Sequence, residues 1–288
     1  MSDPRRVALA YRPPLDWNAL ISFLAARATP GVEIVEPHRY RRTIAVGRRV
    51  GTIEVRAAGR RHALTLDVRM NGGGPGAALV ERVRRMFDLD ADPAAIAAHL
   101  GADPAIGPRL RAHPGIRTPG AWDPFELAVR AVLGQQVSVR AATTIAGRIA
   151  EAFGTPVEDA GGLSRLFPSA AQLADAPVER QGVMPARAVT IRALARAVID
   201  GCVSLDRRRG ADVSRALMAL PGIGPWTASY VAMRAFGERD ALPSGDLVLR
   251  QAAGGCTARE LEAMSQAWRP WRSYAVMLLW HSGRTANV

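Results

Sequence analysis

Hydrophobic and polar residues alternate in three short runs within the first third of the chain. The runs cover residues 40–46, 51–56 and 63–68, and glycines stand between them. A period of two is typical of antiparallel strands that bury one face and leave the other in water. A glycine-rich stretch at 71–76 is expected to form a loop. These features together predict a small antiparallel sheet.

Helical spacing flanks these runs and then extends over the rest of the chain. Asp16 is placed to cap one helix, and a second helix is expected over residues 79–87. From residue 92 almost to the end the periodicity is helical, with prolines near the expected helix starts and in connections, and no strand is predicted there. The predicted fold class is therefore α+β. A sheet domain is expected over residues 1–90 and a helical region over 91–288.

Composition narrows the function. The formal net charge is +12 and all 38 basic side chains are arginines, which favours a polyanionic partner. Without a lysine, no lysine amine can form a Schiff base with a sugar aldehyde. Two cysteines and five scattered histidines give no basis for an iron–sulfur cluster, a zinc site or catalysis by a bound transition metal. The chain has no apolar signal core and no run of membrane length, which predicts a cytoplasmic protein.

A glycine-rich turn between two helices is the most specific motif, at residues 220–228. Gly222 and Gly224 can take a positive φ and leave no Cβ between the backbone and an approaching group. Pro225 suits the first position of the following helix, whose N-terminus attracts anions. We therefore expect this hairpin to bind a phosphate of a nucleic-acid backbone. An ordinary helix–helix turn is the alternative, and DNA-binding modules without enzymatic activity use the same device.

Asp246 lies further along the chain, directly before an apolar run. An Asp in that position is a good helix N-cap, and capping alone would account for it. A carboxylate held rigidly beside bound DNA would also stabilise a positive charge. Such a charge develops on the sugar when the bond between C1′ and a base nitrogen is cleaved. Asp246 is therefore the candidate catalytic residue.

Aromatic residues near the hairpin are candidates for a base pocket. Trp226 and Tyr230 are four residues apart, on one face of the expected helix. Aromatics in this arrangement usually belong to a core, but beside a DNA-binding turn they can stack on an extruded base. Trp280 and Phe23 could complete the walls of the same pocket.

Gly134, Gln135 and Gln136 interrupt a hydrophobic helical pattern. They either end the helix or form a loop tip whose side chain fills the gap left in a base stack. The arginines between Arg39 and Arg49 are more typical of a solvated face than of a binding site.

The hairpin, Asp246, the Gly-Gln-Gln-Val-Ser element and the helical framework together resemble the helix-hairpin-helix DNA glycosylases. Within that superfamily the chain is most similar to the DNA-3-methyladenine glycosylase II (AlkA) family, and the resemblance runs nearly end to end. Further segments that carry it are residues 11–17, 23–28, 125–130 and 269–275.

The resemblance implies a sheet domain similar to half of TATA-binding protein, followed by two helical subdomains with the active-site cleft between them. Asp246 matches the catalytic aspartate of the family. The residues implied for the base pocket are Trp226, Tyr230, Trp280, Phe23 and Leu247. The residues implied for DNA binding are Gln135, Gln136, Gly222, Ile223, Gly224, Trp226 and Thr227. The backbone carbonyls of Met218, Leu220 and Ile223 would hold a structural Na⁺ or K⁺, and no cofactor is required.

This chain departs from the family pattern in three places. Gln136 stands where an intercalating leucine is found, and Leu247 replaces a tyrosine of the pocket. The segment that leads to Asp246 is one residue longer. We expect these changes to affect the range of bases more than the type of reaction.

The resemblance predicts a monofunctional glycosylase of base excision repair. It would flip alkylated bases such as 3-methyladenine and 7-methylguanine out of double-stranded DNA and hydrolyse the N-glycosidic bond. A monomer is expected, in the bacterial cytoplasm and at the nucleoid through DNA, with no membrane partner. Two alternatives stay open: a helix-hairpin-helix DNA-binding protein without activity, and a glycosylase for deaminated or other damaged bases. A glycosylase/lyase is disfavoured because Trp226 occupies the place of the lysine that those relatives use.

Overall fold

The computed structural model describes residues 4–59, 62–70, 76–158, 160–205 and 210–285. The strands are β1 (Arg5–Ala10), β2 (Glu33–Glu36), β3 (Arg39–Val46), β4 (Arg49–Ala57) and β5 (Ala63–Met70). The helices are α1 (Trp17–Ala25), α2 (Ala77–Met86), α3 (Pro93–Leu100), α4 (Gly107–Ala112), α5 (Pro124–Leu133), α6 (Val139–Phe153), α7 (Ala170–Leu173), α8 (Pro185–Ile199), α9 (Gly210–Met218), α10 (Pro225–Val231), α11 (Leu247–Ala252), α12 (Ala258–Met264) and α13 (Arg272–Thr285). Two 3₁₀ turns, η2 (Val178–Gln181) and η5 (Ser265–Trp268), and a π-helical turn, η4 (Ala232–Phe236), complete the elements.

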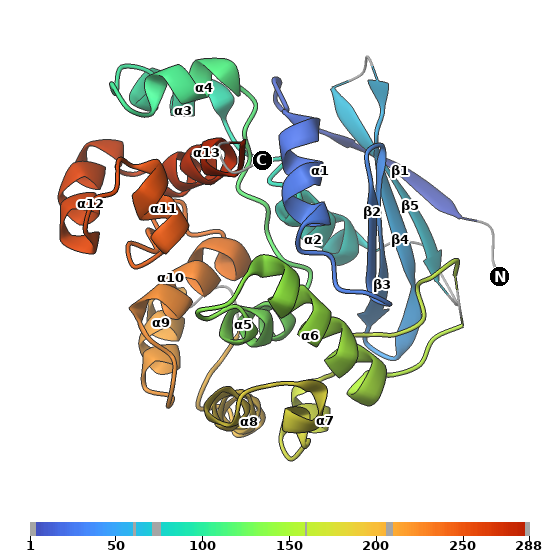
Figure 1. Cartoon of the computed structure of the whole chain (residues 1–288). Helices are drawn as coiled ribbons and strands as arrows, with labels where there is room; N and C mark the ends of the chain where they lie inside the picture. The colour runs from blue at the N-terminus through green and yellow to red at the C-terminus, as the bar shows by residue number, and fades with distance from the viewer. Residues whose placement is uncertain (1–3, 60–61, 71–75, 159, 206–209, 286–288) are drawn as a thin grey trace.

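The five strands form one antiparallel sheet in the order β1-β5-β4-β3-β2 (Figure 1). Tyr40 of β3 pairs with Val55 of β4, which pairs in turn with Leu66 of β5. All three side chains are buried and pack with those of α1 and α2. The other face is charged. On that face an Arg56 guanidinium nitrogen of β4 lies 3.4 Å from a carboxylate oxygen of Asp67 on the neighbouring strand β5. The sheet therefore has the one buried and one solvated face that the alternation predicts.

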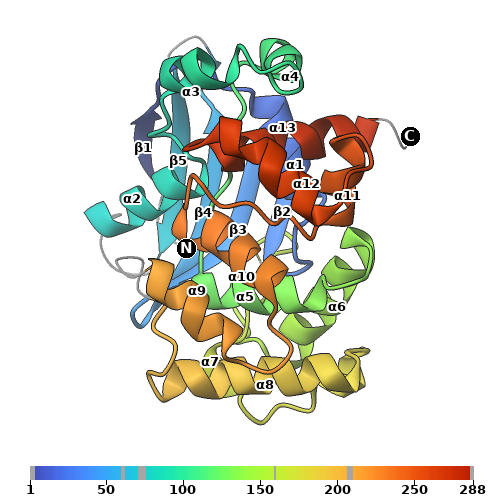
Figure 2. The same ribbon diagram turned by 90° about the vertical axis from the view of Figure 1, so that its left-hand side faces the viewer.

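The helices lie on one side of the sheet, as the two perpendicular views show (Figures 1 and 2). Buried hydrophobic side chains form two clusters. The first joins the sheet, α1 and α2 to α3, α4 and the C-terminal helices α11–α13. The second is built mainly from α5, α6 and α8–α10. Segments from the two ends of the chain thus share one core, and a second helical unit stands beside it. Among the described helices, none is both long enough and apolar enough to cross a membrane.

The predicted α+β class is confirmed, and β3, β4 and β5 contain the three predicted runs. Asp16 caps α1, as predicted, by accepting the Ala19 N–H at 2.9 Å. The strands β1 and β2 were not predicted from the sequence, and β2 has only four residues. Residues 71–75 of the predicted loop lie outside the described residues. The domain boundary at residue 90 stays a prediction, and the first hydrophobic cluster includes residues from both sides of it.

Candidate active-site cleft

The predicted hairpin joins α9 to α10. Gly222 has a φ of 78°, and a Cβ at this position would lie 2.1 Å from the hydroxyl oxygen of Thr190. Glycine is therefore required here both for backbone conformation and for space. Gly224 departs from the expectation of a positive φ, since its φ of −96° is extended backbone that other residues also adopt. Gly224 is exposed, Ile223 is buried beneath it, and Pro225 begins α10 as predicted. The turn is thus anchored on one side and accessible on the other.

Asp246 is the N-cap of α11 and is also held by two tryptophans. Its Oδ1 accepts the backbone N–H of Leu249 at 2.8 Å and the indole N–H of Trp280 at 3.2 Å. Its Oδ2 accepts the indole N–H of Trp226 at 3.0 Å. Asp246 therefore caps α11 and at the same time lies beside two of the predicted pocket aromatics. Three donors fix the orientation of one carboxylate.

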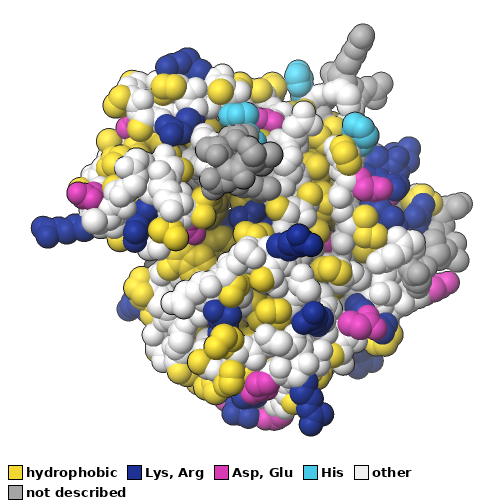
Figure 3. All heavy atoms as spheres, viewed as in Figure 1, with side chains coloured by type: hydrophobic (Ala, Val, Ile, Leu, Met, Phe, Trp, Pro, Cys, Tyr) yellow, Lys and Arg dark blue, Asp and Glu magenta, His cyan; other side chains and the backbone are white. Residues whose placement is uncertain are grey.

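A cavity of about 680 Å³ opens beside Asp246, between the two hydrophobic clusters. Figure 3 shows the surface hollowed at this place, with hydrophobic side chains along the hollow. Near Asp246 the described lining includes Trp226, Tyr230, Trp280 and Val248. Toward the sheet the lining is charged and comprises Arg27, Glu33, Arg42, Glu126, Arg130 and Arg234. The volume lies in the range usual for small-molecule pockets, and polar groups converge at both ends.

The predicted pocket aromatics occupy different places around this cavity. Trp226 and Tyr230 are stacked, with ring centroids 5.6 Å apart, and Tyr230 lies 6.1 Å from the Trp280 ring. Phe23 is buried and stacks on Trp280 at 6.3 Å, and it is not among the described lining residues. Leu247 is 59% exposed and is also not among them, whereas the next residue, Val248, is. Three of the five predicted pocket residues therefore line the cavity.

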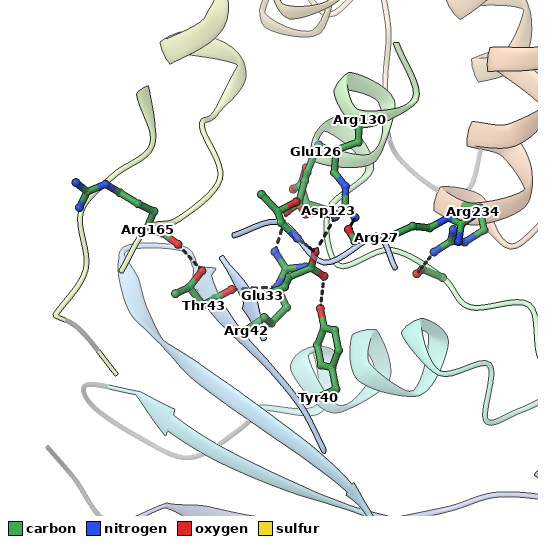
Figure 4. A network of polar contacts seen from close by, with 12 residues as sticks. Arg27, Glu33, Tyr40, Arg42, Thr43, Asp123, Glu126, Arg130, Arg165 and Arg234 are labelled. Atoms are coloured by element: carbon green, nitrogen blue, oxygen red, sulfur yellow. Dashed lines mark hydrogen bonds and ion pairs between the residues drawn. The ribbon is translucent and has the colours of Figure 1, made fainter. Parts of the chain in front are cut away.

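A buried network of ion pairs forms the end of the cavity toward the sheet. Figure 4 shows Tyr40, Arg42 and Arg130 converging around Glu33. Glu126 accepts from Arg42 at 2.7 Å and from Arg130 at 2.8 Å. Burial raises the pKa of Glu33, but the charges of Arg130 and Arg42 outweigh burial and leave this pKa below its ordinary value. Arg42 was expected on a solvated face, yet it is only 3% exposed because two carboxylates compensate its charge.

Tyr230 and Arg234 form a second polar group in the cavity. Arg234 is 4% exposed and donates to the Tyr230 hydroxyl at 3.0 Å. It also donates to the carbonyls of Pro119 and Gly120. Burial lowers the pKa of Arg234 to about 10, so the guanidinium stays charged at neutral pH. Arg27 stacks over the Phe23 ring, 3.8 Å from its centroid.

The loop after α5 is bonded to the hairpin. The Gln135 side-chain amide donates to the Gly222 carbonyl and to the Thr227 hydroxyl, both at 2.9 Å. Arg187 donates to the Gln135 carbonyl. Gln136 is exposed and has a φ of 53°, a left-handed conformation that directs it away from the helix path. Of the two glutamines predicted to contact DNA, Gln135 thus bonds within the protein and Gln136 faces solvent.

The carbonyls predicted to hold a cation lie around the same turn. Met218 ends α9, and the Leu220 carbonyl accepts the N–H of Ile223 at 3.3 Å. Backbone carbonyl oxygens suit hard cations such as Na⁺ and K⁺. This donor set fits a monovalent ion, and the cation site stays a prediction.

The arginines that line the cavity were not predicted from the sequence, although two of them have an aromatic partner at helical spacing. Arg234 lies four residues after Tyr230, and Arg27 lies four residues after Phe23. In a continuous helix that spacing would place each arginine on the same face as a predicted pocket aromatic. α1 ends at Ala25, so Arg27 lies in the turn that follows the helix. Arg42, Glu33 and Glu126 carried no such signal because they come from elements far apart in the chain.

Fold and cleft together define an α+β protein with the architecture of the helix-hairpin-helix DNA glycosylases. The family model of the AlkA N-terminal domain matches residues 6–123. The DNA-3-methyladenine glycosylase 2 of Escherichia coli K12 is 34% identical over 280 residues, which cover 95% of this chain and 96% of that protein. The chain belongs to the AlkA family of DNA-3-methyladenine glycosylases.

The chain is also similar to a second curated protein and to a solved structure. A Mycobacterium tuberculosis H37Rv protein, named as a probable bifunctional transcriptional activator/DNA repair enzyme AlkA, is 44% identical over 280 residues. This match covers 94% of the present chain and 56% of that relative, so the chain spans about half of its length. The structure of a 3-methyladenine DNA glycosylase from Archaeoglobus fulgidus superposes with a TM-score of 0.83, at 20% identity and 99% coverage of both chains. That likeness concerns the fold alone.

Proposed function

We propose that this chain is a monofunctional DNA glycosylase that removes alkylated bases from double-stranded DNA. The observation that carries the proposal is the carboxylate of Asp246, which three N–H donors hold in the wall of a cavity that is also lined by aromatic rings. The choice of alkylated bases rests on the relatives, which are named as 3-methyladenine glycosylases. Substrates would include 3-methyladenine and 7-methylguanine.

Each part of the cleft has a role in this mechanism. The hairpin at Gly222 and Gly224 would hold a phosphate, and the exposed Gln136 would occupy the stack that the extruded nucleotide leaves. The base would enter the cavity and stack on Trp226. Asp246 would stabilise the positive charge that develops on the sugar as the bond to C1′ breaks, and water would then add at C1′. The products are the free base and an abasic site.

The absence of lysine from the sequence supports hydrolysis without a covalent intermediate. A glycosylase/lyase needs an amine that attacks C1′ and forms a Schiff base. Incubation with damaged DNA and borohydride should therefore trap no protein–DNA adduct. A strong adduct would contradict the monofunctional assignment.

Release of free bases tests the proposal directly. Methylated duplex DNA is incubated with the wild type and with Asp246→Asn, and the released bases are quantified by mass spectrometry. We expect 3-methyladenine and 7-methylguanine from the wild type and at least about a hundredfold less from the variant. Asp175→Asn removes an exposed carboxylate, 85% accessible, and serves as the matched control. A binding protein without activity would release no base in any sample while retaining its affinity for DNA.

We further propose that the protein acts as a monomer and needs no cofactor for the reaction. The carbonyls of Met218, Leu220 and Ile223 would hold a Na⁺ or K⁺ that strengthens the hold of the hairpin on phosphate. Double-stranded DNA is the proposed partner, and the bacterial cytoplasm is the proposed location.

A further inference from the structure

The hydroxyl of Tyr230 lies between two cationic side chains inside the cavity. Its oxygen accepts an N–H of Arg234 at 3.0 Å. The charge of Arg27 also acts on this hydroxyl, and both guanidinium groups pack against the Phe23 ring, at 3.8 Å for Arg27 and 4.6 Å for Arg234. Because guanidinium groups only donate, the phenol oxygen must be the acceptor in its contact with Arg234. Its own proton is left to donate to another partner. Among the described residues, no acceptor takes a hydrogen bond from this O–H.

The charges around Tyr230 differ from those at the end of the cavity toward the sheet. There Arg42 and Arg130 are compensated by Glu33 and Glu126. In the described part of the chain, no carboxylate oxygen lies within 4.0 Å of the Arg234 or Arg27 guanidinium. The Tyr230 hydroxyl therefore faces two guanidinium groups that form no ion pair with any described carboxylate, and a phenolate formed at this place would be stabilised.

We propose that the Tyr230 hydroxyl donates its proton to the departing base when that base is neutral. The inference rests on the proposed glycosylase function and extends it to a second class of substrate. The bond between C1′ and the base nitrogen breaks, its electron pair goes to the base, and the phenol proton moves to a nitrogen or oxygen of that base. Water supplies hydroxide to C1′ and the remaining proton passes to solvent. The phenolate then regains a proton from solvent.

The pKa of Tyr230 agrees with this role. Burial raises it, but the charges of Arg234, Arg27 and Arg130 outweigh burial and leave it below the ordinary value of a tyrosine. A lower pKa makes the phenol a better acid and its conjugate base a more stable product.

The charge of the base decides whether this proton is needed. A base alkylated on a ring nitrogen, such as 7-methylguanine, is cationic in DNA and leaves as a neutral molecule. A neutral purine such as hypoxanthine leaves as an anion unless it gains a proton. The Tyr230 hydroxyl should therefore matter more for hypoxanthine than for 7-methylguanine.

The test measures single-turnover release from two duplexes, one with hypoxanthine and one with 7-methylguanine. Tyr230→Phe keeps the ring and removes the hydroxyl. The ratio of the hypoxanthine rate to the 7-methylguanine rate is expected to fall about tenfold or more. Both rates come from one preparation, so a loss of folded protein lowers them equally and leaves the ratio intact.

Tyr274→Phe is the matched control. The Tyr274 hydroxyl is bonded to Asp88 at 2.9 Å and does not line the described cavity, so its removal should leave the ratio unchanged. An unchanged ratio in Tyr230→Phe, an equal fall in both variants, or a wild type that releases 7-methylguanine but no hypoxanthine would overturn the inference. A wild type that releases neither base would instead contradict the proposed function itself.

Discussion

The Trp226 indole N–H donates to Asp246 Oδ2 across 3.0 Å, although these residues are 20 positions apart in the chain. Trp226 stands in the first turn of α10, directly after the hairpin, and Asp246 stands at the start of α11. The bond therefore links the turn proposed to hold a phosphate to the carboxylate proposed to face C1′. The Trp226 side chain thus fixes the position of the Asp246 carboxylate relative to the phosphate-binding turn.

Trp226→Phe should reduce catalysis more than binding. The phenyl ring can still stack on Tyr230, but Oδ2 of Asp246 loses its indole donor. A hydrogen bond to a charged group contributes about 1.5–3 kcal/mol, so the maximal rate of base release should fall about tenfold to a hundredfold. Single-turnover kinetics and fluorescence anisotropy on the same duplex separate rate from affinity. Trp17→Phe removes an indole bond to Pro37, outside the cavity, and should leave the rate unchanged. An equal rate in Trp226→Phe and wild type would show that this bond does not position the carboxylate.

Glu126→Gln should destabilise the fold. The substitution removes one of two carboxylates that compensate Arg42 and Arg130, and it leaves the buried Arg42 and the partly buried Arg130 to share Glu33. Breaking a buried ion pair in this way typically costs about 3–5 kcal/mol. Urea denaturation measures the free energy of unfolding. Glu151→Gln breaks an ion pair of a carboxylate that is 66% exposed, and it should cost less than about 1 kcal/mol. Similar losses in the two variants would mean that the buried network contributes no more than a surface pair.

Local patterns predicted much of this molecule. The alternating runs predicted β3–β5, Asp16 was identified as a cap, and the spacing of Trp226 and Tyr230 placed two aromatic rings on one helical face. These features depend on residues close in sequence, where periodicity and capping chemistry act. The position of Asp246 beside the predicted pocket aromatics came from the family resemblance, because no local rule brings α11 against α10.

The charged end of the cavity could not be predicted in the same way. Glu33 and Arg130 are 97 residues apart, and in the sequence each resembles an ordinary surface residue. Only the packing of α5 against the sheet buries them together and makes their charges cancel. The sequence also did not show that Val248, rather than Leu247, lines the cavity. The direction of the first turn of α11 decides which of these two adjacent side chains faces it.

Asp88 should make stability depend on pH. Burial raises its pKa to about 6, so the folded state binds this proton more tightly than the unfolded state does. Its contribution to the free energy of unfolding is therefore present near pH 4 and is lost as the pH rises through about 6. Asp88→Asn cannot ionise, and asparagine tolerates the left-handed φ of 50° at this position. The stability of the variant relative to wild type should rise by about 1–3 kcal/mol between pH 4 and pH 7. Urea denaturation at several pH values checks this, with the exposed Asp90→Asn as control. A difference that stays constant with pH would contradict the assignment.

Gln135 should act on DNA binding through the hairpin. Its amide bonds both the Gly222 carbonyl and the Thr227 hydroxyl, and these two contacts join the loop that carries Gln136 to the turn proposed to hold phosphate. Gln135→Met keeps the length of the side chain but loses both bonds. We expect the free energy of unfolding to fall by about 1–2 kcal/mol and affinity for duplex DNA to fall about threefold to tenfold, because the loop and the turn must then be ordered on binding. Gln266→Met removes an amide bond to the Glu262 carbonyl and should leave affinity unchanged. If Gln135→Met lost stability but bound DNA as tightly as Gln266→Met, the contact would serve folding alone, and the loop and the hairpin would engage DNA independently.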